Sequence, residues 1–464
     1  MKLNLLVADD PSATDYEQCH GKKWSLATYE LGGEQQPDEV PEYSCVSYTW
    51  GAGRRAHSFH KNAMISDRTL NALAAVTRQR PHCKAIWLDA LCVPPIEERE
   101  WHAATLESMG YIYSRAQETV VVLSCATAPA LVWMNAGNDT VLPEHLDMLE
   151  KEEWTCRAWT YQEATNSRAL RFICEHYSDA LVVEFNTFFD RVSGTLSRLQ
   201  QLDVKRYPRL NELENLLADC AVAGYQGRSA FQAMSVMENR TQTREDDHFY
   251  AMIGAITAEP ASSAAGGVTA CEAFISLCER KGDYSFIYSA APRDDSRRWR
   301  PVSHGSLPVV FAWSSWGPGQ PGYYKDGDLY LESMVMSRKG VPAESSREYI
   351  RQWFAACEHH VAASPVPMED VIANILSGMG FCGSRDPISV EHGFFFPYKS
   401  LDKENVPVVL ISTDIRWVMG APALAARMAG DELQEYVPGV FVGQVWEGVD
   451  KASVNVSSRS GPMA

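Results

Sequence analysis

One carboxylate in a short aromatic segment is the first candidate for chemistry in this chain. The segment Trp159–Glu163 reads WTYQE, and on a helix Trp159 and Glu163 are four positions apart and share a face. A carboxylate beside a large aromatic ring, partly shielded from water, can hold an unusual pKa or contact a cationic ligand. The alternative is structural: Trp159 packs, and Glu163 binds Arg157 or a backbone amide. Spacing alone favours the structural alternative.

Aromatic and acidic side chains also follow two apolar runs upstream. Cys45–Tyr48 predicts a short strand, which is followed by Trp50 and a glycine-containing loop. Tyr48 or Trp50 either lies against the ring of a ligand or packs as a strand cap, and these alternatives are about even. Asp89 closes a second buried run, where it caps the following turn, pairs with Arg157 or binds a ligand.

Strands and helices alternate around these residues. The predicted strands are 24–31, 45–48, 85–88, 119–124 and 170–173, and the predicted helices are 70–78, 101–115 and 154–165. This alternation predicts an α/β unit with a parallel sheet and helices on its faces. Ligands of such sheets bind at the carboxyl ends of the strands, which is where Tyr48, Asp89 and Ser124 fall.

The chain is too long for one ordinary core, with 464 residues. We expect an N-terminal extension (1–40), an α/β core (41–175), a helical extension (176–300), a mixed α+β region (301–450) and a disordered tail (451–464). Further strands are expected at 309–313, 329–336, 408–411 and 440–446, and further helices at 210–223 and 270–281. A loop is expected at 262–267.

Composition excludes several classes of protein. The net charge of −17 argues against a general nucleic-acid binder and against docking on anionic lipid, although Arg293–Arg300 (RDDSRRWR) is a local basic candidate. Twelve cysteines without a C-x-x-C pair indicate buried free thiols in a reducing compartment. No apolar run is long enough to span a membrane, so we expect a soluble cytoplasmic protein.

Four motifs resemble the fungal heterokaryon-incompatibility (HET) domain. They are Tyr43–Gly51 (YSCVSYTWG), Ile86–Val93 (IWLDALCV), Trp154–Glu163 (WTCRAWTYQE) and Arg240–Ala255 (RTQTREDDHFYAMIGA). The family has Asn-Gln after the second motif, where this chain has Pro94-Pro95. The resemblance implies a fungal protein of non-self recognition and programmed cell death, and it covers about 250 residues.

The HET domain itself looks like a divergent TIR domain, which implies a TIR/flavodoxin-like sheet. In TIR enzymes a W-C-x-x-E glutamate cleaves nicotinamide from NAD, and Trp159 and Glu163 match that pattern, with Thr160 in place of the cysteine. The resemblance therefore implies Glu163 as the catalytic residue. Asp89 would then bind a ribose hydroxyl, and Tyr48, Trp50 and Trp159 would form an aromatic wall.

In the fourth motif, Arg240, Asp247 and Tyr250 fall on the family pattern. Thr243 followed by acids indicates a helix N-terminus, with Thr243 as the cap. A buried Arg–Asp link back to the α/β unit is favoured here over a catalytic role.

Three functions stay open at this point. The first is NAD hydrolysis by Glu163, with NAD as substrate and no cofactor or metal; the second is a non-catalytic module that self-associates or docks another protein of the HET pathway. The third is recruitment of the fold to a small-molecule biosynthetic reaction. A metal site is not expected, because His248 stands alone and His359-His360 belong to no H-E-x-x-H motif.

Overall fold

The protein divides into two compact units. The computed structural model describes residues 1–31, 40–60, 63–177, 181–200, 207–222, 227–257, 259–260, 269–303, 305–312, 315–356, 366–402, 406, 408–417, 419–430, 432–445 and 451–462. Unit 1 comprises Met1–Tyr225 and Asn239–Val268, and unit 2 comprises Gln226–Glu238 and Thr269–Ala464. His359-His360 and the loop expected at 262–267 lie outside the described residues.

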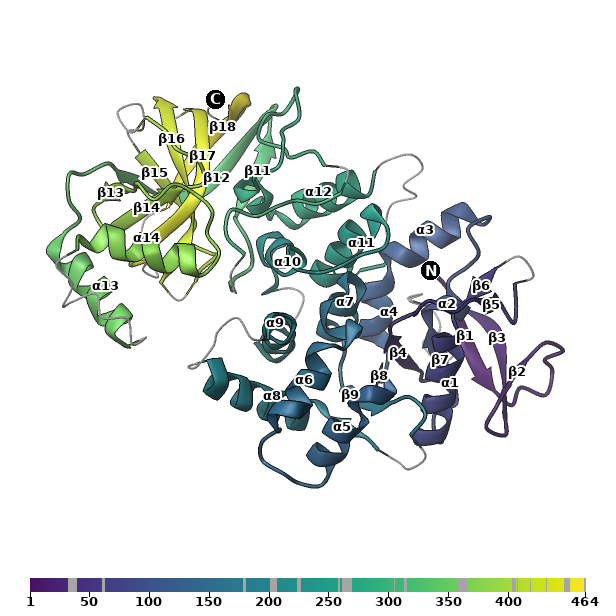
Figure 1. Ribbon diagram of the computed structural model, residues 1–464. Coiled ribbons are helices and arrows are strands. Elements are labelled where there is room, and N and C mark those ends of the chain that lie inside the picture. Colours follow the sequence, from purple (N-terminus) through teal and green to yellow (C-terminus); the bar gives the residue numbers. More distant parts are fainter. Residues whose placement is uncertain are drawn as a thin grey trace. The chain divides into compact units, whose positions relative to one another are not determined.

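Unit 1 is built on a mixed sheet with the strand order β10-β9-β8-β4-β7-β1-β3-β2 (Figure 1). The strands are β1 (Lys2–Ala8), β2 (Glu17–Cys19), β3 (Lys22–Glu30), β4 (Ser44–Tyr48), β7 (Ala85–Leu88), β8 (Glu118–Leu123), β9 (Leu170–Cys174) and β10 (Val183–Glu184). β4 pairs in parallel with β7 and β8, and β8 pairs in parallel with β9. A separate hairpin joins β5 (Arg55–Ala56) and β6 (Met64–Ile65).

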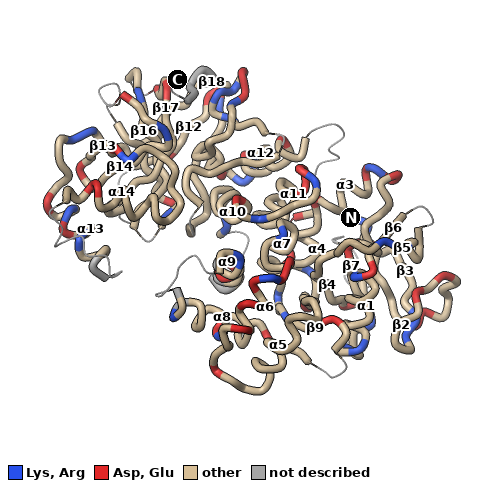
Figure 2. The backbone as a smooth tube through the Cα atoms, viewed as in Figure 1, with Lys and Arg blue, Asp and Glu red and all other residues tan. Residues whose placement is uncertain are grey.

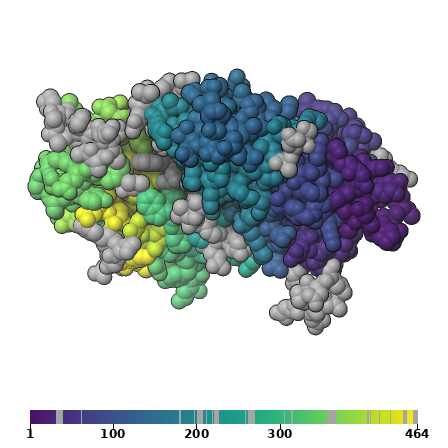
Figure 3. Space-filling view, turned by 90° about the horizontal axis from the view of Figure 1, so that it is seen from below, coloured from purple at the N-terminus to yellow at the C-terminus, as the bar shows by residue number. Residues whose placement is uncertain are grey.

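The parallel centre of this sheet confirms the expected α/β unit. β4, β7 and β8 are buried along their whole length, as strands covered on both faces must be. The antiparallel strands at the edges were only partly expected: β3 was predicted, but β1, β2 and β10 were not. β1 pairs with β7, so the N-terminal residues extend the sheet, and in Figure 3 they adjoin the residues that follow them in unit 1.

Unit 1 contains the helices expected at 70–78 and 210–223, two expected helices that are broken, and several helices that were not predicted individually. They are α1 (Asp67–Gln79), α2 (Asp89–Cys92), α3 (Arg99–Glu107), α4 (Met109–Arg115), α5 (Ala128–Asn135), α6 (Pro143–Glu150), α7 (Ala158–Thr165), α8 (Phe185–Gln200), α9 (Pro208–Val222) and α11 (Glu245–Ile256), with the 3-10 turns η1 (Cys125–Thr127) and η2 (Glu153–Cys156). The helix expected at 101–115 is divided at Ser108. The helix expected at 154–165 begins as η2 and becomes α-helical only after Arg157.

α1 and α7 cover opposite faces of the sheet. Adjacent residues of a strand point to opposite faces. Ser47 of β4 donates to Glu163 of α7, whereas the neighbouring Tyr48 hydroxyl bonds to Thr69 of α1. The side chains at the end of β4 are thus divided between the two helices.

Unit 2 combines a short helical segment with a β-rich sheet. Its helices are α10 (Ala230–Met237), α12 (Ala270–Lys281), the 3-10 turn η4 (Ser285–Tyr288), α13 (Glu344–Ala356) and α14 (Met368–Gly378). Its strands are β11 (Gly322–Lys325), β12 (Asp328–Ser337), β13 (Ile388–Val390), β14 (Gly393–Pro397), β15 (Val408–Ile411), β16 (Gly420–Ala429), β17 (Glu432–Gly443) and β18 (Ala452–Pro462). The order is β11-β12-β15-β16-β17-β14-β13, and β18 pairs with both β12 and β17, so five strands close on themselves.

Two sequence predictions for this unit are wrong. Residues 452–462, expected to be disordered, form β18, which pairs with β12 and β17 and buries Val454 and Val456. Of the strand expected at 309–313, the structure describes residues 309–312; Val309, Val310 and Phe311 are buried, and the only bridge among these described residues joins Val309 to Ser289. β16 was missed because its sequence is rich in alanine and contains a proline, both of them uncommon in strands.

The division into units also differs from the boundary expected near residue 300. α10 and α12 belong to unit 2, where the buried Asp283 carboxylate accepts hydrogen bonds from the amides of Ala230, Ser285 and Gln320. One buried acid therefore ties three distant segments together.

Charge is spread along both units. Figure 2 shows acidic and basic residues interspersed in each of them, so the excess of acid is not confined to one segment of the described chain. Among the described residues, no helix has both the length and the apolar character needed to cross a membrane.

Candidate functional site

Side chains from three elements converge where β4 and β7 end. Ser47 and Tyr48 come from the end of β4, and Asp89 is the first residue of α2, directly after β7. Glu163 comes from α7, which covers one face of these strands. The parallel centre of the sheet thus brings together residues that are up to 116 positions apart.

Glu163 is buried and hydrogen-bonded. Its side chain is only 4% exposed, and its Oε2 atom accepts a hydrogen bond of 2.5 Å from the Ser47 hydroxyl. Ser47 in turn accepts a hydrogen bond of 2.7 Å from Nε1 of the buried Trp154. This chain, Trp154 to Ser47 to Glu163, holds the carboxyl in one orientation. None of the described residues forms an ion pair with Glu163.

Burial raises the pKa of Glu163 to about 8, and the negative charge of Asp89 acts in the same direction. The Ser47 hydrogen bond and the positive charge of Arg157 oppose this rise. Glu163 is therefore mostly a neutral acid at neutral pH. A cation placed beside it would favour the carboxylate form and lower this pKa.

Asp89 is the more accessible of the two acids. Its side chain is partly buried, and it accepts hydrogen bonds from Nε1 of Trp50 at 2.9 Å and from the Ala90 amide at 2.6 Å. Burial raises the pKa of Asp89, while the bonds from Trp50, Ala90 and Tyr48 oppose that rise. Trp50 itself is 41% exposed, so an aromatic ring stands at the surface beside this carboxyl.

Two tyrosine hydroxyls flank these acids from opposite faces of the sheet. Tyr48 lies against Thr69 at 2.9 Å and also hydrogen-bonds to Asp89. The Tyr113 hydroxyl on α4 lies 3.3 Å from the Val46 carbonyl and also hydrogen-bonds to Glu163. Burial raises the pKa of both hydroxyls, which stay neutral.

Arg157 precedes α7 and supplies positive charge to both acids. It lowers the pKa of Glu163 and of Asp89, although no ion pair joins it to either one among the described residues. Its backbone carbonyl accepts a hydrogen bond of 2.9 Å from Arg240. The alternative in which Arg157 simply neutralises Glu163 or Asp89 through a salt bridge is therefore not what the structure contains.

The fourth motif holds α7 in place from its outer side. The Arg240 guanidinium is buried, donates to the Thr160 hydroxyl at 3.2 Å and lies over the Tyr161 ring. Asp247 accepts a hydrogen bond from Trp159, and Tyr250 stacks on Trp159 with ring centroids 6.5 Å apart.

Two details of this motif were predicted wrongly. Arg240 and Asp247 form no link to each other; they contact α7 separately. Thr243 is not the cap of α11, because the N-cap position is Arg244 and no side chain caps it. Trp159 turns toward α11 and stacks on Tyr250, so the aromatic residues linked to the Glu163 carboxyl are Tyr113 and, through Ser47, Trp154.

Three helices meet closely behind Glu163. A Cβ atom on Gly254 of α11 would stand 1.4 Å from Oε1 of Gln162, and one on Gly110 of α4 would stand 2.1 Å from the Gly254 carbonyl oxygen. Asn166 donates to that carbonyl at 2.6 Å. Only glycine fits at these crossings, and α7 is therefore fixed between α4 and α11.

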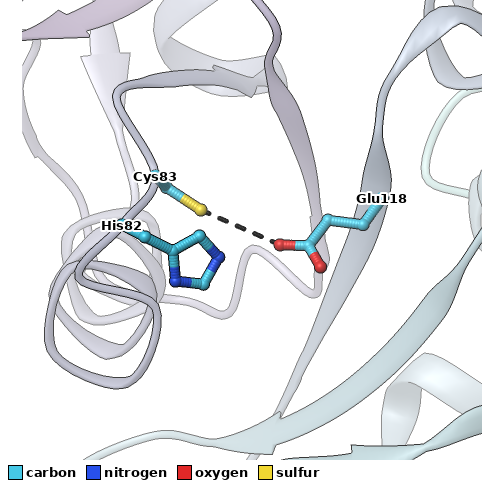
Figure 4. A group of neighbouring side chains, drawn as sticks. All are labelled: His82, Cys83 and Glu118. Atoms are coloured by element: carbon cyan, nitrogen blue, oxygen red, sulfur yellow. Dashed lines mark hydrogen bonds between the residues drawn. The ribbon is translucent and has the colours of Figure 1, made fainter.

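A cluster of His82, Cys83 and Glu118 has ligand atoms within 4.8 Å of one another (Figure 4). However, Arg80 and Arg171 both bond to Oε2 of Glu118, at 2.6 and 2.7 Å. Two guanidinium groups on the one carboxylate repel a metal cation and occupy its lone pairs. This cluster is an ion-pair network rather than a metal site.

The cysteines of the parallel core are buried thiols. Burial raises the pKa of Cys92 to about 12 and raises that of Cys45 well above its ordinary value. Neither is activated as a nucleophile, because the thiolate is disfavoured.

Sequence reasoning missed three members of this site: Ser47, Tyr113 and Trp154. Ser47 and Trp154 lie inside motifs that were noted for their other residues. Tyr113 lies in the helix expected at 101–115, and its ring is buried in the core while its hydroxyl carries the polar contacts. The signal for all three was a polar atom on a residue that the pattern places in the core.

The fold and the site define an α/β protein in which two carboxyls, those of Glu163 and Asp89, lie close enough at the ends of parallel strands for the charge of one to act on the other. Residues 43–163, from the residue before β4 to Glu163, match the family model described as heterokaryon incompatibility protein (HET). The chain therefore carries a HET domain. A search of curated proteins and a search of solved structures gave no match. The TIR-like relationship stays a prediction.

Proposed function

We propose that this protein acts in a heterokaryon-incompatibility response and that its HET domain hydrolyses the N-glycosidic bond of a nicotinamide nucleotide, with Glu163 as the catalytic residue. The HET match supports the first part. The second part rests mainly on one observation: Glu163 and Asp89 interact at the carboxyl ends of parallel strands, where α/β proteins bind ligands.

The protonation of Glu163 suits this chemistry. Loss of nicotinamide leaves positive charge on the ribose C1 and its ring oxygen, and a nearby anion stabilises that state. The free protein keeps Glu163 largely protonated, because burial raises its pKa to about 8. A bound pyridinium ring carries a positive charge, which favours ionisation of Glu163 as the substrate arrives. The charge is then present only when the reaction needs it.

Other residues at the strand ends take binding roles in this proposal. Asp89 accepts hydrogen bonds from ribose hydroxyls, and the exposed Trp50 ring stacks on a base or on nicotinamide. Arg157 lies close enough to influence both acids and attracts the phosphates. Tyr48 and Trp159 stay structural, because their polar atoms bond to Thr69 and Asp247.

Access to Glu163 requires a conformational step. Its carboxyl is 4% exposed, so the loop after β4 must move when substrate binds or when protein molecules assemble. The Trp50–Asp89 hydrogen bond at the surface is the contact that this movement would break.

A non-catalytic module is the second candidate function. The burial of Glu163 also favours this function. As a neutral acid bonded to Ser47 and Tyr113, Glu163 has its hydrogen-bonding needs met without a substrate. In that case the HET domain acts by self-association or by docking a partner.

Nicotinamide release from NAD separates the two candidates. We expect release by the wild type when it is clustered on a scaffold and little release when it is dilute. Glu163→Gln should abolish release, whereas Glu153→Gln, an exposed acid of the same motif, should leave it unchanged. If folded, clustered wild type releases no nicotinamide, NAD hydrolysis is excluded and the docking module remains.

A further inference from the structure

A pocket of about 620 Å³ lies within unit 2, between the end of α12 and the hairpin β11–β12. Figure 1 shows β11 beside α12, and Arg297 from the connecting segment completes the lining. The volume falls in the range of small-molecule sites. This pocket uses none of the residues of the HET domain.

One wall of this pocket is aromatic and exposed. Tyr324 on β11 is 49% exposed and lies 6.1 Å, centroid to centroid, from the fully buried Trp299. The buried Tyr284 also lines the pocket and packs on Trp299. The neighbouring Tyr323 stacks on Tyr330 and, as the adjacent residue of the strand, points to the other face of the hairpin. Tyr324, supported by Trp299, is thus the exposed ring on which a flat ligand can stack.

The lining also contains cations. Arg280 and Lys281 lie in the last turn of α12, and Arg297 comes from the loop before Trp299 and lies over the Trp299 ring at 6.0 Å. The Lys281 ammonium donates to the Arg228 carbonyl, so Arg280 and Arg297 are the guanidinium groups that a ligand can meet. The one acid in the lining, Glu279, is bound by Arg300 at 2.9 Å and lies 4.0 Å from Arg297. The pocket is therefore net positive in a chain whose net charge is −17.

The ordinary explanation covers only part of this arrangement. Basic residues at a helix C-terminus complement the helix dipole, which accounts for Arg280 and Lys281. It accounts neither for Arg297, which comes from another segment, nor for the half-exposed Tyr324 beside the Trp299 ring. A cation and an exposed aromatic ring in one pocket are the two features needed to bind a phosphate and its base.

We propose that this pocket binds a nucleoside phosphate, with its base stacked on Tyr324 and its phosphate held by Arg280 and Arg297. The site is separate from Glu163 and does not depend on the function proposed for the HET domain. A nucleotide bound here would be a ligand of unit 2, bound outside the HET domain.

Calorimetric titration of the full chain with AMP tests this proposal. We expect AMP to bind, and adenosine or inorganic phosphate alone to bind at least about tenfold more weakly. Adenosine lacks the phosphate that the cationic side chains hold, and inorganic phosphate lacks the base that stacks on Tyr324. Tyr324→Ala and Arg280→Gln should each weaken AMP binding by about tenfold. The matched controls Tyr398→Ala and Lys339→Gln, which change exposed residues of the same unit outside the pocket, should bind as the wild type does.

The Glu163→Gln variant separates this site from the HET domain. AMP binding that persists in this variant supports the pocket in unit 2. The proposal is overturned if folded protein gives no AMP binding, if Tyr324→Ala and Arg280→Gln bind AMP as the wild type does, or if Glu163→Gln abolishes binding. Phosphate alone binding as well as AMP would also overturn it, since stacking on Tyr324 would then contribute nothing.

Discussion

Replacement of Glu163 by glutamine should change how the stability of unit 1 depends on pH. The folded protein raises the pKa of Glu163 from 4.5 to about 8. Below pH 4.5 the carboxyl is protonated in both the folded and the unfolded chain, so its full contribution to stability is present. Between pH 4.5 and 8 only the unfolded chain loses the proton, and stability falls as the pH rises.

The size of this effect follows from the two pKa values. Each pH unit between them costs about 1.4 kcal/mol, so the complete loss above pH 8 is on the order of 4 to 5 kcal/mol. Glutamine has no proton to lose, and its carbonyl can still accept the Ser47 hydrogen bond. Glu163→Gln should therefore match the wild type near pH 5 and exceed it in stability by several kcal/mol at pH 9. Asp89, whose pKa is also raised, leaves a smaller slope of the same sign in the variant.

Urea unfolding at pH 5, 7 and 9 measures this difference. Hydrogen exchange of peptides from β4 and α7 reads unit 1 separately from unit 2, because the two units need not unfold together. Glu153→Gln removes an exposed acid of the same motif and should keep the slope of the wild type. If the wild type and Glu163→Gln lose stability in parallel from pH 5 to pH 9, Glu163 does not carry a raised pKa and the account of its burial is wrong.

Two further outcomes follow from the same contacts. Gly254→Ala should destabilise unit 1 by about 1 to 3 kcal/mol, because the new methyl group collides with Gln162. The control Gly194→Ala changes an open helical position and should be neutral or slightly stabilising. Thermal unfolding compares the two variants, and equal melting temperatures would contradict the close crossing of the helices. Ser47→Ala removes a hydrogen bond that lowers the pKa of Glu163. The loss of stability with rising pH should therefore continue to a higher pH in this variant than in the wild type. If it ends at the same or a lower pH, the Ser47 hydrogen bond does not act on Glu163 as described.

The parallel centre of unit 1 was predictable because its strands are short, rich in apolar and β-branched residues, and followed by polar residues. β7 occupies the residues expected for it, and β4, β8 and β9 each differ by a single residue at one or both ends. β1 was not predicted because residues 1–40 were expected to be an extension outside the α/β core, whereas β1 lies inside the sheet and pairs with both β7 and β3. β18 was not predicted because its serines suggested disorder, while two valines two positions apart were enough to bury one side.

The candidate site shows a different limit of sequence reasoning. Motifs indicated which residues to examine, and Glu163, Asp89 and Trp50 do meet at the strand ends. They did not indicate on which face of the sheet each residue lies, and this divides Tyr48 from Glu163. Which side chains of β4 point toward α1 and which toward α7 depends on how the strand is set in the sheet. A motif of mixed aromatic and polar residues does not determine this.

The helices behind Glu163 explain why the fourth motif lies so far along the chain from the first three. α7 is short, and its own sequence gives it no amphipathic stripe, because all but one of its residues are buried. It is held instead by Arg240 at its start, by Trp159 stacked on Tyr250, and by the Gly254 crossing near its end. A helix fixed at these points keeps Glu163 within reach of Ser47 without any ion pair to the carboxyl. The fourth motif thus orients the candidate catalytic acid while none of its residues touches it.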